Sequence, residues 1–192
     1  MVNSISYSVR LVVFLSFMTE HSLTFMLPTI IVYYLENLYR NSGEINPSLE
    51  EVSYHIGILE GLYGCFALVA GTFWGVVSDK IGRKSSLIII FTGISLSSIG
   101  LGLASSFNSA IFWRSVLGCF AGIIPTTKAL MRDVSNDSNI GVLYSFFGAG
   151  YGAGSIFGPL LGGFLSCPNT SLPNSLRFQF LNDYPYFLPF LA

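Results

Sequence analysis

The chain has 192 residues, of which 52% are hydrophobic and only 10% are charged, and its mean hydropathy is +0.63. Soluble domains carry about 25% charged residues, so this composition indicates an integral membrane protein in contact with the lipid bilayer. The formal net charge of −1 provides no attraction for nucleic acid. Cys65, Cys119 and Cys167 are too few and too scattered for a disulfide framework or a metal site, so we expect no metal and no cofactor.

Long apolar runs predict five complete membrane-spanning helices. They cover, approximately, residues 11–35, 56–77, 86–104, 110–131 and 141–165. At about 1.5 Å per residue, each run is long enough to cross a hydrocarbon core of roughly 30 Å. Residues 184–192 are apolar but too short to cross, and we interpret them as the start of a sixth helix. The predicted fold class is therefore all-α, a polytopic bundle of membrane helices.

The first span contains residues that are unusual inside a membrane helix, because Glu20, His21 and Pro28 all lie in its interior. A carboxylate about 15 Å inside a bilayer costs some 3 kcal/mol unless it faces protein, water or a partner. Glu20 is therefore either part of a proton or substrate pathway, or a carboxyl group kept protonated inside the bundle. We interpret His21 as a packed histidine rather than a proton relay, and we expect Pro28 to bend the helix.

The second span is preceded by a polar external loop over residues 37–53 and carries Glu60 in its outer part. It ends in a short charged turn, residues 75–84, that joins it to the third span. The turn contains Lys80, Arg83 and Lys84, the densest group of cations in the chain, which places it on the cytoplasmic side of the membrane. Gly82 permits a tight reversal of the chain, so the two spans run antiparallel.

The pattern G-x-x-x-D-K-x-G-R-K in this turn resembles the signature loop between the second and third helices of the major facilitator superfamily. The matching residues are Gly75, Asp79, Lys80, Gly82, Arg83 and Lys84. A loop that only set the topology would need the cations, but neither the acid nor the glycines. Residues 57–61 and 73–84 together are similar to fungal facilitators related to drug:proton antiporters. The resemblance implies an incomplete N-terminal six-helix half of the major facilitator fold.

The third span is uncharged and we expect it to serve packing, whereas the fourth span contains Arg114. An arginine inside a span requires an acid, backbone carbonyls or water. Arg114 and Glu60 both lie one to two turns from the external ends of their spans, so they could pair. Residues 114–118 resemble the fourth-helix pattern of the superfamily, in which the arginine is linked to proton coupling. The pair is either part of that coupling or a static brace.

Asp133 follows the fourth span and returns to the same membrane surface as Asp79 and Arg83. In the superfamily an acid here joins the charges of the signature loop. The resemblance therefore implies a cytoplasmic latch that favours one access state. The alternative is ordinary capping of a helix end by solvated charges, because surface ion pairs are individually weak.

The fifth span has glycines at intervals of four, from Gly150 to Gly162, which form one smooth face for a neighbouring helix. Residues 154–163 resemble the fifth-helix motif of facilitator antiporters. The motif residues are Gly154, Gly158, Pro159, Gly162 and Gly163. The resemblance favours antiport over uniport or symport. Generic packing of small residues is the alternative.

The distribution of cations predicts a cytoplasmic N-terminus. Six cations fall on the proposed inner side, namely Arg10, Lys80, Arg83, Lys84, Lys128 and Arg132, against Arg40 and Arg177 outside. The sequon at Asn169 then lies in an external loop and is a candidate for glycosylation, whereas the sequon at Asn136 is cytoplasmic and should stay unmodified. These features favour the plasma membrane or the vacuolar membrane.

Two functions fit these observations. The first is proton-coupled antiport or efflux of small organic molecules, with Glu20, Glu60 and Arg114 lining or gating the pathway, in a larger transporter whose C-terminal half is missing here. The second is a truncated, non-transporting membrane protein that packs against a full-length relative. The sequence has neither a phosphate-binding loop nor H-E-x-x-H, so an enzyme has little support. A channel would predict no charge latch.

Overall fold

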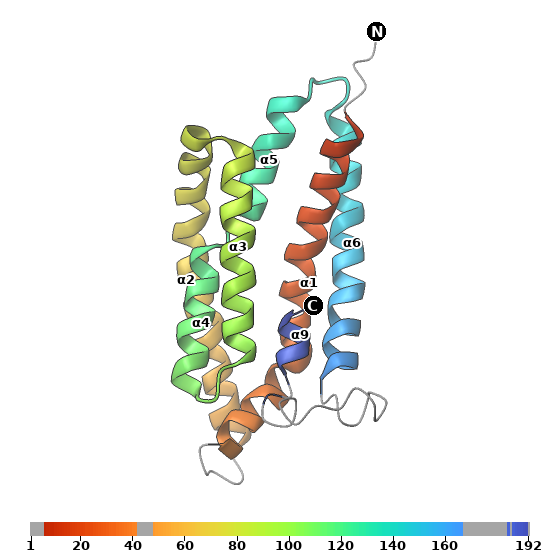
Figure 1. Ribbon diagram of the computed structural model, residues 1–192. Helices are drawn as coiled ribbons and strands as arrows, with labels where there is room; N and C mark the ends of the chain where they lie inside the picture. The colour runs from red at the N-terminus through yellow and green to blue at the C-terminus, as the bar shows by residue number, and fades with distance from the viewer. Residues whose placement is uncertain (1–5, 42–47, 167–183, 185, 192) are drawn as a thin grey trace.

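The computed structural model describes residues 6–41, 48–166, 184 and 186–191, and within these ranges every regular element is a helix. In chain order the helices are α1 (Tyr7–Asn41), α2 (Leu49–Ile81), α3 (Arg83–Gly102), α4 (Phe107–Cys119), α5 (Ile123–Val134), α6 (Ile140–Leu165) and the short α9 (Phe187–Leu191) (Figure 1). The prediction of an all-α membrane bundle is confirmed. Five segments are long and apolar enough to cross a bilayer, with α4 and α5 together forming one of them.

The two longest helices extend past the apolar runs that reveal them in the sequence. Both α1 and α2 continue into polar residues beyond the predicted spans 11–35 and 56–77. At the start of α2, the Ser48 hydroxyl accepts from the Glu51 amide, and the Glu51 carboxylate accepts from the Ser48 amide. This reciprocal cap satisfies backbone donors at the helix end, so α2 begins before its hydrophobic stretch does.

The junction of α2 and α3 is the tight reversal that the glycine of the charged turn predicts. Gly82 has φ +90°, a left-handed backbone conformation that side chains disfavour, and it alone separates Ile81 from Arg83. The two helices therefore run back along each other in the same part of the bundle (Figure 1).

The fourth predicted span, residues 110–131, is built from two helices, α4 and α5, which together form one candidate span. The α-helix ends at Cys119 and resumes at Ile123. Pro125, in the first turn of α5, has no backbone N–H and cannot continue the hydrogen-bond pattern of α4. The indole Nε1 of Trp74 donates to the Cys119 carbonyl at 2.9 Å, and a Cβ at Gly122 would lie 2.5 Å from the Trp74 ring. Trp74 thus stabilises the break.

The closest helix pair is α1 with α6, which lie side by side (Figure 1). A Cβ built at Gly150, Gly154 or Gly158 would lie 2.6, 2.6 and 2.4 Å from a carbonyl oxygen of α1. Real side chains do not approach a backbone oxygen so closely, so these glycines are required for the contact. The smooth face predicted for the fifth span is thus buried against the first.

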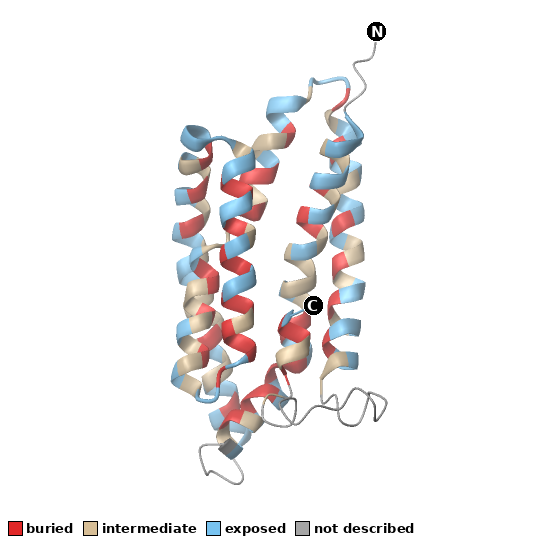
Figure 2. Ribbon diagram, viewed as in Figure 1, coloured by how far each residue is buried: buried red, intermediate tan, exposed pale blue. Residues whose placement is uncertain are grey.

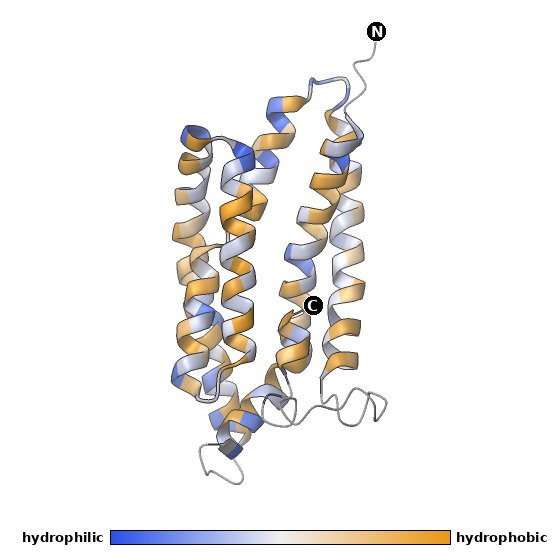
Figure 3. Ribbon diagram, viewed as in Figure 1, coloured by the Kyte–Doolittle hydropathy of each residue, from blue (hydrophilic) through white to orange (hydrophobic). Residues whose placement is uncertain are grey.

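Buried residues lie along the long helices beside exposed ones (Figure 2), and hydrophobic residues are spread along the same helices (Figure 3). Many large apolar side chains are exposed. Leu68 and Phe164, for example, are 77% and 61% exposed. On a soluble protein such a surface would aggregate, whereas lipid acyl chains solvate it. Cys65 and Cys119 are also exposed.

Helix α1 remains helical through Pro28, and its C-terminal part curves toward the start of α2 (Figure 1). At that end, the Tyr39 hydroxyl is hydrogen-bonded to the imidazole of His55 on α2, whose ring packs edge-on against Phe107 of α4. These contacts gather the ends of three helices on the side of the membrane opposite to the charged turn.

Candidate functional site

Arg114 and Glu60 form a direct ion pair inside the bundle, as the sequence predicts. Arg114 lies on α4 and is 7% exposed, and its Nη2 is 2.9 Å from both carboxylate oxygens of Glu60 on α2. Gly118, one turn further along α4, makes the close approach possible, because a Cβ there would lie 2.8 Å from the Tyr63 carbonyl oxygen. The pairing offsets the cost of placing a guanidinium in the membrane.

Tyr63, which the sequence analysis did not single out, completes the surroundings of Arg114. It lies one turn after Glu60, and Arg114 Cζ is 4.0 Å from the centroid of its ring. This stacking is a cation–π contact that stabilises a guanidinium away from water. Arg114 Nε is buried without a hydrogen-bond partner in the described part of the chain. Glu60 and Tyr63 are three residues apart on one helix face, and this spacing could have indicated from the sequence that Tyr63 lies beside Arg114.

Glu20 of α1 lines the same cavity as this ion pair. The cavity has a volume of about 60 Å³, enough for a few water molecules. Its lining comes from α1 (Glu20, Leu23, Thr24), α2 (Glu60, Tyr63), α3 (Ile94), α4 (Arg114, Leu117) and the α4–α5 break (Ala121). The three charged residues predicted from separate spans therefore meet around one space between four helices.

The second charged cluster joins the α2–α3 turn to the end of α5. Arg83 Nε donates to Asp133 Oδ2 at 2.8 Å, and Arg83 Nη1 lies 2.5 Å from Asp79 Oδ1. The same Nη1 donates to the hydroxyl of Ser78 at 2.6 Å. The structure thus brings together the three predicted latch residues and adds Ser78, which the sequence analysis did not identify. Its hydroxyl also donates to the Gly75 carbonyl, which orients it toward Arg83.

Three other residues of the signature pattern lie outside this cluster. Lys80 and Lys84 are exposed and make no ion pair with the described residues, and space is open around Gly75. Their positions fit contact with solvent or anionic lipid headgroups rather than with Arg83.

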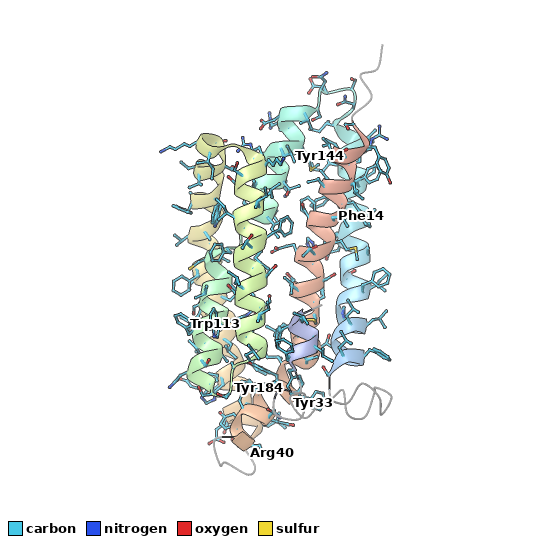
Figure 4. All side chains as sticks on the ribbon, viewed as in Figure 1. Phe14, Tyr33, Arg40, Trp113, Tyr144 and Tyr184 are labelled. Atoms are coloured by element: carbon cyan, nitrogen blue, oxygen red, sulfur yellow. The ribbon has the colours of Figure 1, made fainter. Side chains whose placement is uncertain are left out.

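The glycines of the fifth-helix motif divide between two faces of α6. Gly154, Gly158 and Gly162 face α1, whereas Gly163 is exposed with open space around it. Pro159 is half-buried, and α6 continues through it to Leu165. A similar close contact joins α3 and α4, where Trp113 of α4, which Figure 4 labels, covers Gly100 of α3.

His21 is packed among aromatic rings, as interpreted from the sequence. Its Nδ1 is 2.8 Å from the Phe17 carbonyl oxygen, and its ring lies 4.5 Å from that of Tyr151 on α6, centroid to centroid. The glycosylation candidate Asn169 lies outside the described residues. In the part of the chain that the structure describes, no three His, Cys, Asp or Glu side chains gather as metal ligands would.

The apolar exterior, the five candidate spans and the charged groups placed inside them define an integral, multi-pass membrane protein. Residues 10–175 match the profile of the Major Facilitator Superfamily. The match covers most of the chain, and the chain belongs to this superfamily of membrane transporters.

Curated relatives include transporters from fungi and plants. The chain is 28% identical over 156 residues to the major facilitator-type transporter psiT2 of Psilocybe cyanescens, covering 81% of this chain and 30% of that protein. It is 29% identical to the efflux pump azaK of Aspergillus niger, covering 74% of this chain and 28% of the pump. It is 32% identical to the protein ZINC INDUCED FACILITATOR-LIKE 1 of Arabidopsis thaliana, covering 71% of this chain and 30% of that protein. The chain thus spans about 30% of the length of these relatives.

Proposed function

We propose that this chain contributes the N-terminal part of a proton-coupled exporter of small organic molecules. The observation that carries the proposal is the meeting of Glu20, Glu60 and Arg114 around one cavity inside the membrane-spanning bundle. Ionisable groups at this depth are costly, and they mark proton or substrate pathways in transporters. Similarity to the efflux pump azaK adds support for the direction of transport.

The Glu60–Arg114 pair supplies a means of coupling. Ionised Glu60 holds Arg114 against α2 through two hydrogen bonds. A proton on Glu60 removes its negative charge, weakens the attraction and leaves the guanidinium in need of another partner. Because the pair joins α2 to α4, protonation would shift the balance between two arrangements of these helices.

The cluster of Asp79, Arg83 and Asp133 would favour one of the two access states. It ties the α2–α3 turn to the end of α5 at the surface that we assign to the cytoplasm. Exposed pairs contribute little one at a time, but here one guanidinium contacts two carboxylates and a hydroxyl. Rocking of one half of a facilitator against the other would have to break or rearrange these contacts.

In this proposal the N-terminus is cytoplasmic and the protein resides in the plasma membrane or the vacuolar membrane. The proposal follows from the cations, because Lys80, Arg83 and Lys84 share the end of the bundle at which α2 meets α3. Asn169 would then be external and open to glycosylation.

The remaining part of the transporter would pack against α2, where five glycines have open space around them: Gly57, Gly61, Gly64, Gly71 and Gly75. Small residues at these positions let a partner helix approach closely. The same observation favours a second candidate function, in which the chain does not transport but packs against a full-length relative.

Flux measurements in vesicles test the proposal. Vesicles containing the 192-residue chain would be loaded with a panel of amphipathic compounds, with and without an imposed pH gradient, beside an Asp79→Asn/Arg114→Ala control. Gradient-dependent flux that is lost in the control would show that the chain by itself assembles into a working exporter. Absence of flux from correctly inserted chain would contradict transport by the chain itself and favour the packing function.

A further inference from the structure

Arg114 has two partners of different kinds on α2. Its Nη2 donates to both carboxylate oxygens of Glu60 at 2.9 Å, and its Cζ lies 4.0 Å from the centroid of the Tyr63 ring. A proton on Glu60 neutralises the carboxylate and removes most of its attraction for the guanidinium. The electron-rich face of the Tyr63 ring is unaffected by that proton. The ring is therefore the partner on α2 that persists when Glu60 is protonated.

Packing of the helix backbones holds the Tyr63 ring opposite the guanidinium. A Cβ at Gly118 would lie 2.8 Å from the Tyr63 carbonyl oxygen and 3.4 Å from Tyr63 Cα, so α4 lies directly against the backbone of residue 63. Arg114 precedes Gly118 by four residues and therefore shares its helix face. Because this close contact leaves the two helices little freedom, the ring stays near Arg114 without help from the Glu60 carboxylate.

A second partner matters because the guanidinium cannot lose its charge. Arg114 is 7% exposed, and its Nε is buried without a hydrogen-bond partner in the described part of the chain. Arginine keeps its proton in proteins, so the positive charge remains when Glu60 is neutralised. A buried charge without compensation is costly, and a long side chain escapes that cost by extending toward water or headgroups. A cation–π contact away from water offsets part of the cost.

We propose that Tyr63 is a positioning residue for proton coupling, whose ring retains the Arg114 guanidinium in the cavity when Glu60 takes up a proton. The inference rests on the proposed transport function and names the residue that lets its ion pair open and close again. In this step a proton from water binds the Glu60 carboxylate, and Arg114 keeps its own proton. Two carboxylates and one guanidinium line the cavity, so the net charge of the ionised set rises from −1 to 0.

The other titratable groups around the pair leave this role to Tyr63. Glu20 of α1 is the second acid that lines the cavity, and it remains as a counter-charge for the retained guanidinium. The ring of His21 packs against α6 instead, and the ammonium group of Lys128 on α5 lies over a phenyl ring of α6. From α3, the cavity receives the apolar Ile94.

Fluorination of the ring at residue 63 tests the proposal, because fluorine withdraws electron density from the ring face while changing the size of the ring little. In the 192-residue chain in detergent, Tyr63 would be replaced by phenylalanine and by its mono-, di- and trifluorinated forms. Tyr63→Phe keeps the ring and should unfold as the wild type does. We expect the unfolding equilibrium constant, followed by circular dichroism, to rise with each fluorine, by about 5- to 30-fold over the series. A ring that only fills space would give a flat series.

Phe66 provides the matched control, because it lies one turn further along α2 and no cation of the described residues lies over its ring. The same fluorinated series at Phe66 should be flat. Glu60→Gln imitates protonated Glu60, and in that background the series at residue 63 should be at least as steep, since the ring is then the remaining partner of Arg114 on α2.

The ¹⁹F resonance of 4-fluorophenylalanine at residue 63 reports directly on the guanidinium. The informative comparison is Glu60→Gln with Glu60→Gln/Arg114→Gln, because the two variants differ only in the cation. We expect different chemical shifts, with Glu60→Gln closer to the chain that has Glu60 and Arg114 intact. Packing alone would not produce this order.

The proposal is overturned if the series at residue 63 is no steeper than the series at Phe66, or if the resonances of Glu60→Gln and Glu60→Gln/Arg114→Gln coincide. Failure of the transport function has a different signature. A steep series at residue 63 without flux in vesicles would retain the contact with Arg114 and reject transport by the chain. Gradient-dependent flux that fluorination at residue 63 leaves unchanged would retain transport and reject the role of Tyr63 in coupling.

Discussion

At the scale of single residues, the main energetic feature is a nearly buried guanidinium, Arg114, with a single carboxylate partner. Both carboxylate oxygens of Glu60 accept from Arg114 Nη2 at 2.9 Å, and Tyr63 covers one face of the guanidinium. Arg114 Nε remains unpaired among the described residues. With so few partners, the stabilisation of the Arg114 guanidinium depends strongly on the negative charge of Glu60.

Removing one member of this pair should cost more than removing both. We expect Glu60→Gln to lower the free energy of unfolding by about 2–3 kcal/mol, because it leaves the buried Arg114 without a counter-charge. The double variant Glu60→Gln/Arg114→Gln should recover much of that loss. Unfolding of the chain in detergent, followed by circular dichroism, measures these differences. Glu50→Gln, in the exposed first turn of α2, is the control. A double variant less stable than Glu60→Gln alone would contradict the prediction.

At the scale of helices, the α1–α6 contact shows why glycines with the same spacing have different roles. Gly158 packs against the backbone of Ser22, whereas Gly163, on the other face of α6, has open space. In α2, Gly57 and Gly61 also have open space. The spacing alone indicates that close packing is possible, and the neighbouring helix decides whether it occurs.

The alanine substitution Gly158→Ala should destabilise the bundle. Its Cβ would lie 2.4 Å from the Ser22 carbonyl oxygen and 2.9 Å from Ser22 Cα, so α1 and α6 would have to move apart. We expect a loss of about 1–3 kcal/mol, as for other overpacked contacts. The control Gly163→Ala adds the same methyl group in open space and should be neutral or slightly stabilising, because alanine favours helix. Equal unfolding midpoints for the two variants would contradict this interpretation of the contact.

At the scale of the whole molecule, charged contacts connect parts of the chain that are far apart in sequence. Arg83 and Asp133 join the α2–α3 turn to the end of α5, and Arg114 and Glu60 join α4 to α2 nearer the other end of the bundle. One long helix, α2, thus takes part in both clusters, through Glu60 and Asp79. A movement of α2 would therefore affect both charged clusters together.

Neutralising the cluster of Asp79, Arg83 and Asp133 should loosen that end of the bundle. In a cysteine-free background with spin labels at Lys80→Cys and Ser138→Cys, we expect Asp79→Asn/Asp133→Asn to broaden the measured distance distribution, because Arg83 loses both of its carboxylate partners. High salt should broaden the distribution of the unmutated pair in the same direction. Lys84→Gln, which changes a cation outside the cluster, should have no effect. An unchanged distribution in the double Asn variant would show that these contacts do not hold the two segments together.

Much of the fold, namely the number of spans, the reversal between α2 and α3 and the depth of the charged residues, follows from local properties of the sequence. The number of spans depends on the length of apolar runs, and the reversal at Gly82 depends on a backbone conformation that glycine tolerates. The depth of Glu60 and Arg114 along their helices follows from counting residues, because the helical rise is constant. This was enough to indicate that Glu60 and Arg114 could pair and that Asp79, Arg83 and Asp133 lie at one surface. The contact among the last three was implied by the resemblance to the major facilitator superfamily.

Only the tertiary structure decided which faces meet. Residue counting gives the depth of a side chain along a helix axis but leaves open which neighbouring helix it contacts, since that depends on how all the helices pack at once. Three features depend on this packing and could not be read from the sequence. They are the placement of Glu20 beside Glu60 and Arg114, the contact of the α6 glycines with α1, and the stabilisation of the α4–α5 break by Trp74. Pro125 is a local sequence signal for the break between α4 and α5, but no local signal indicates that Trp74 of α2 packs against it.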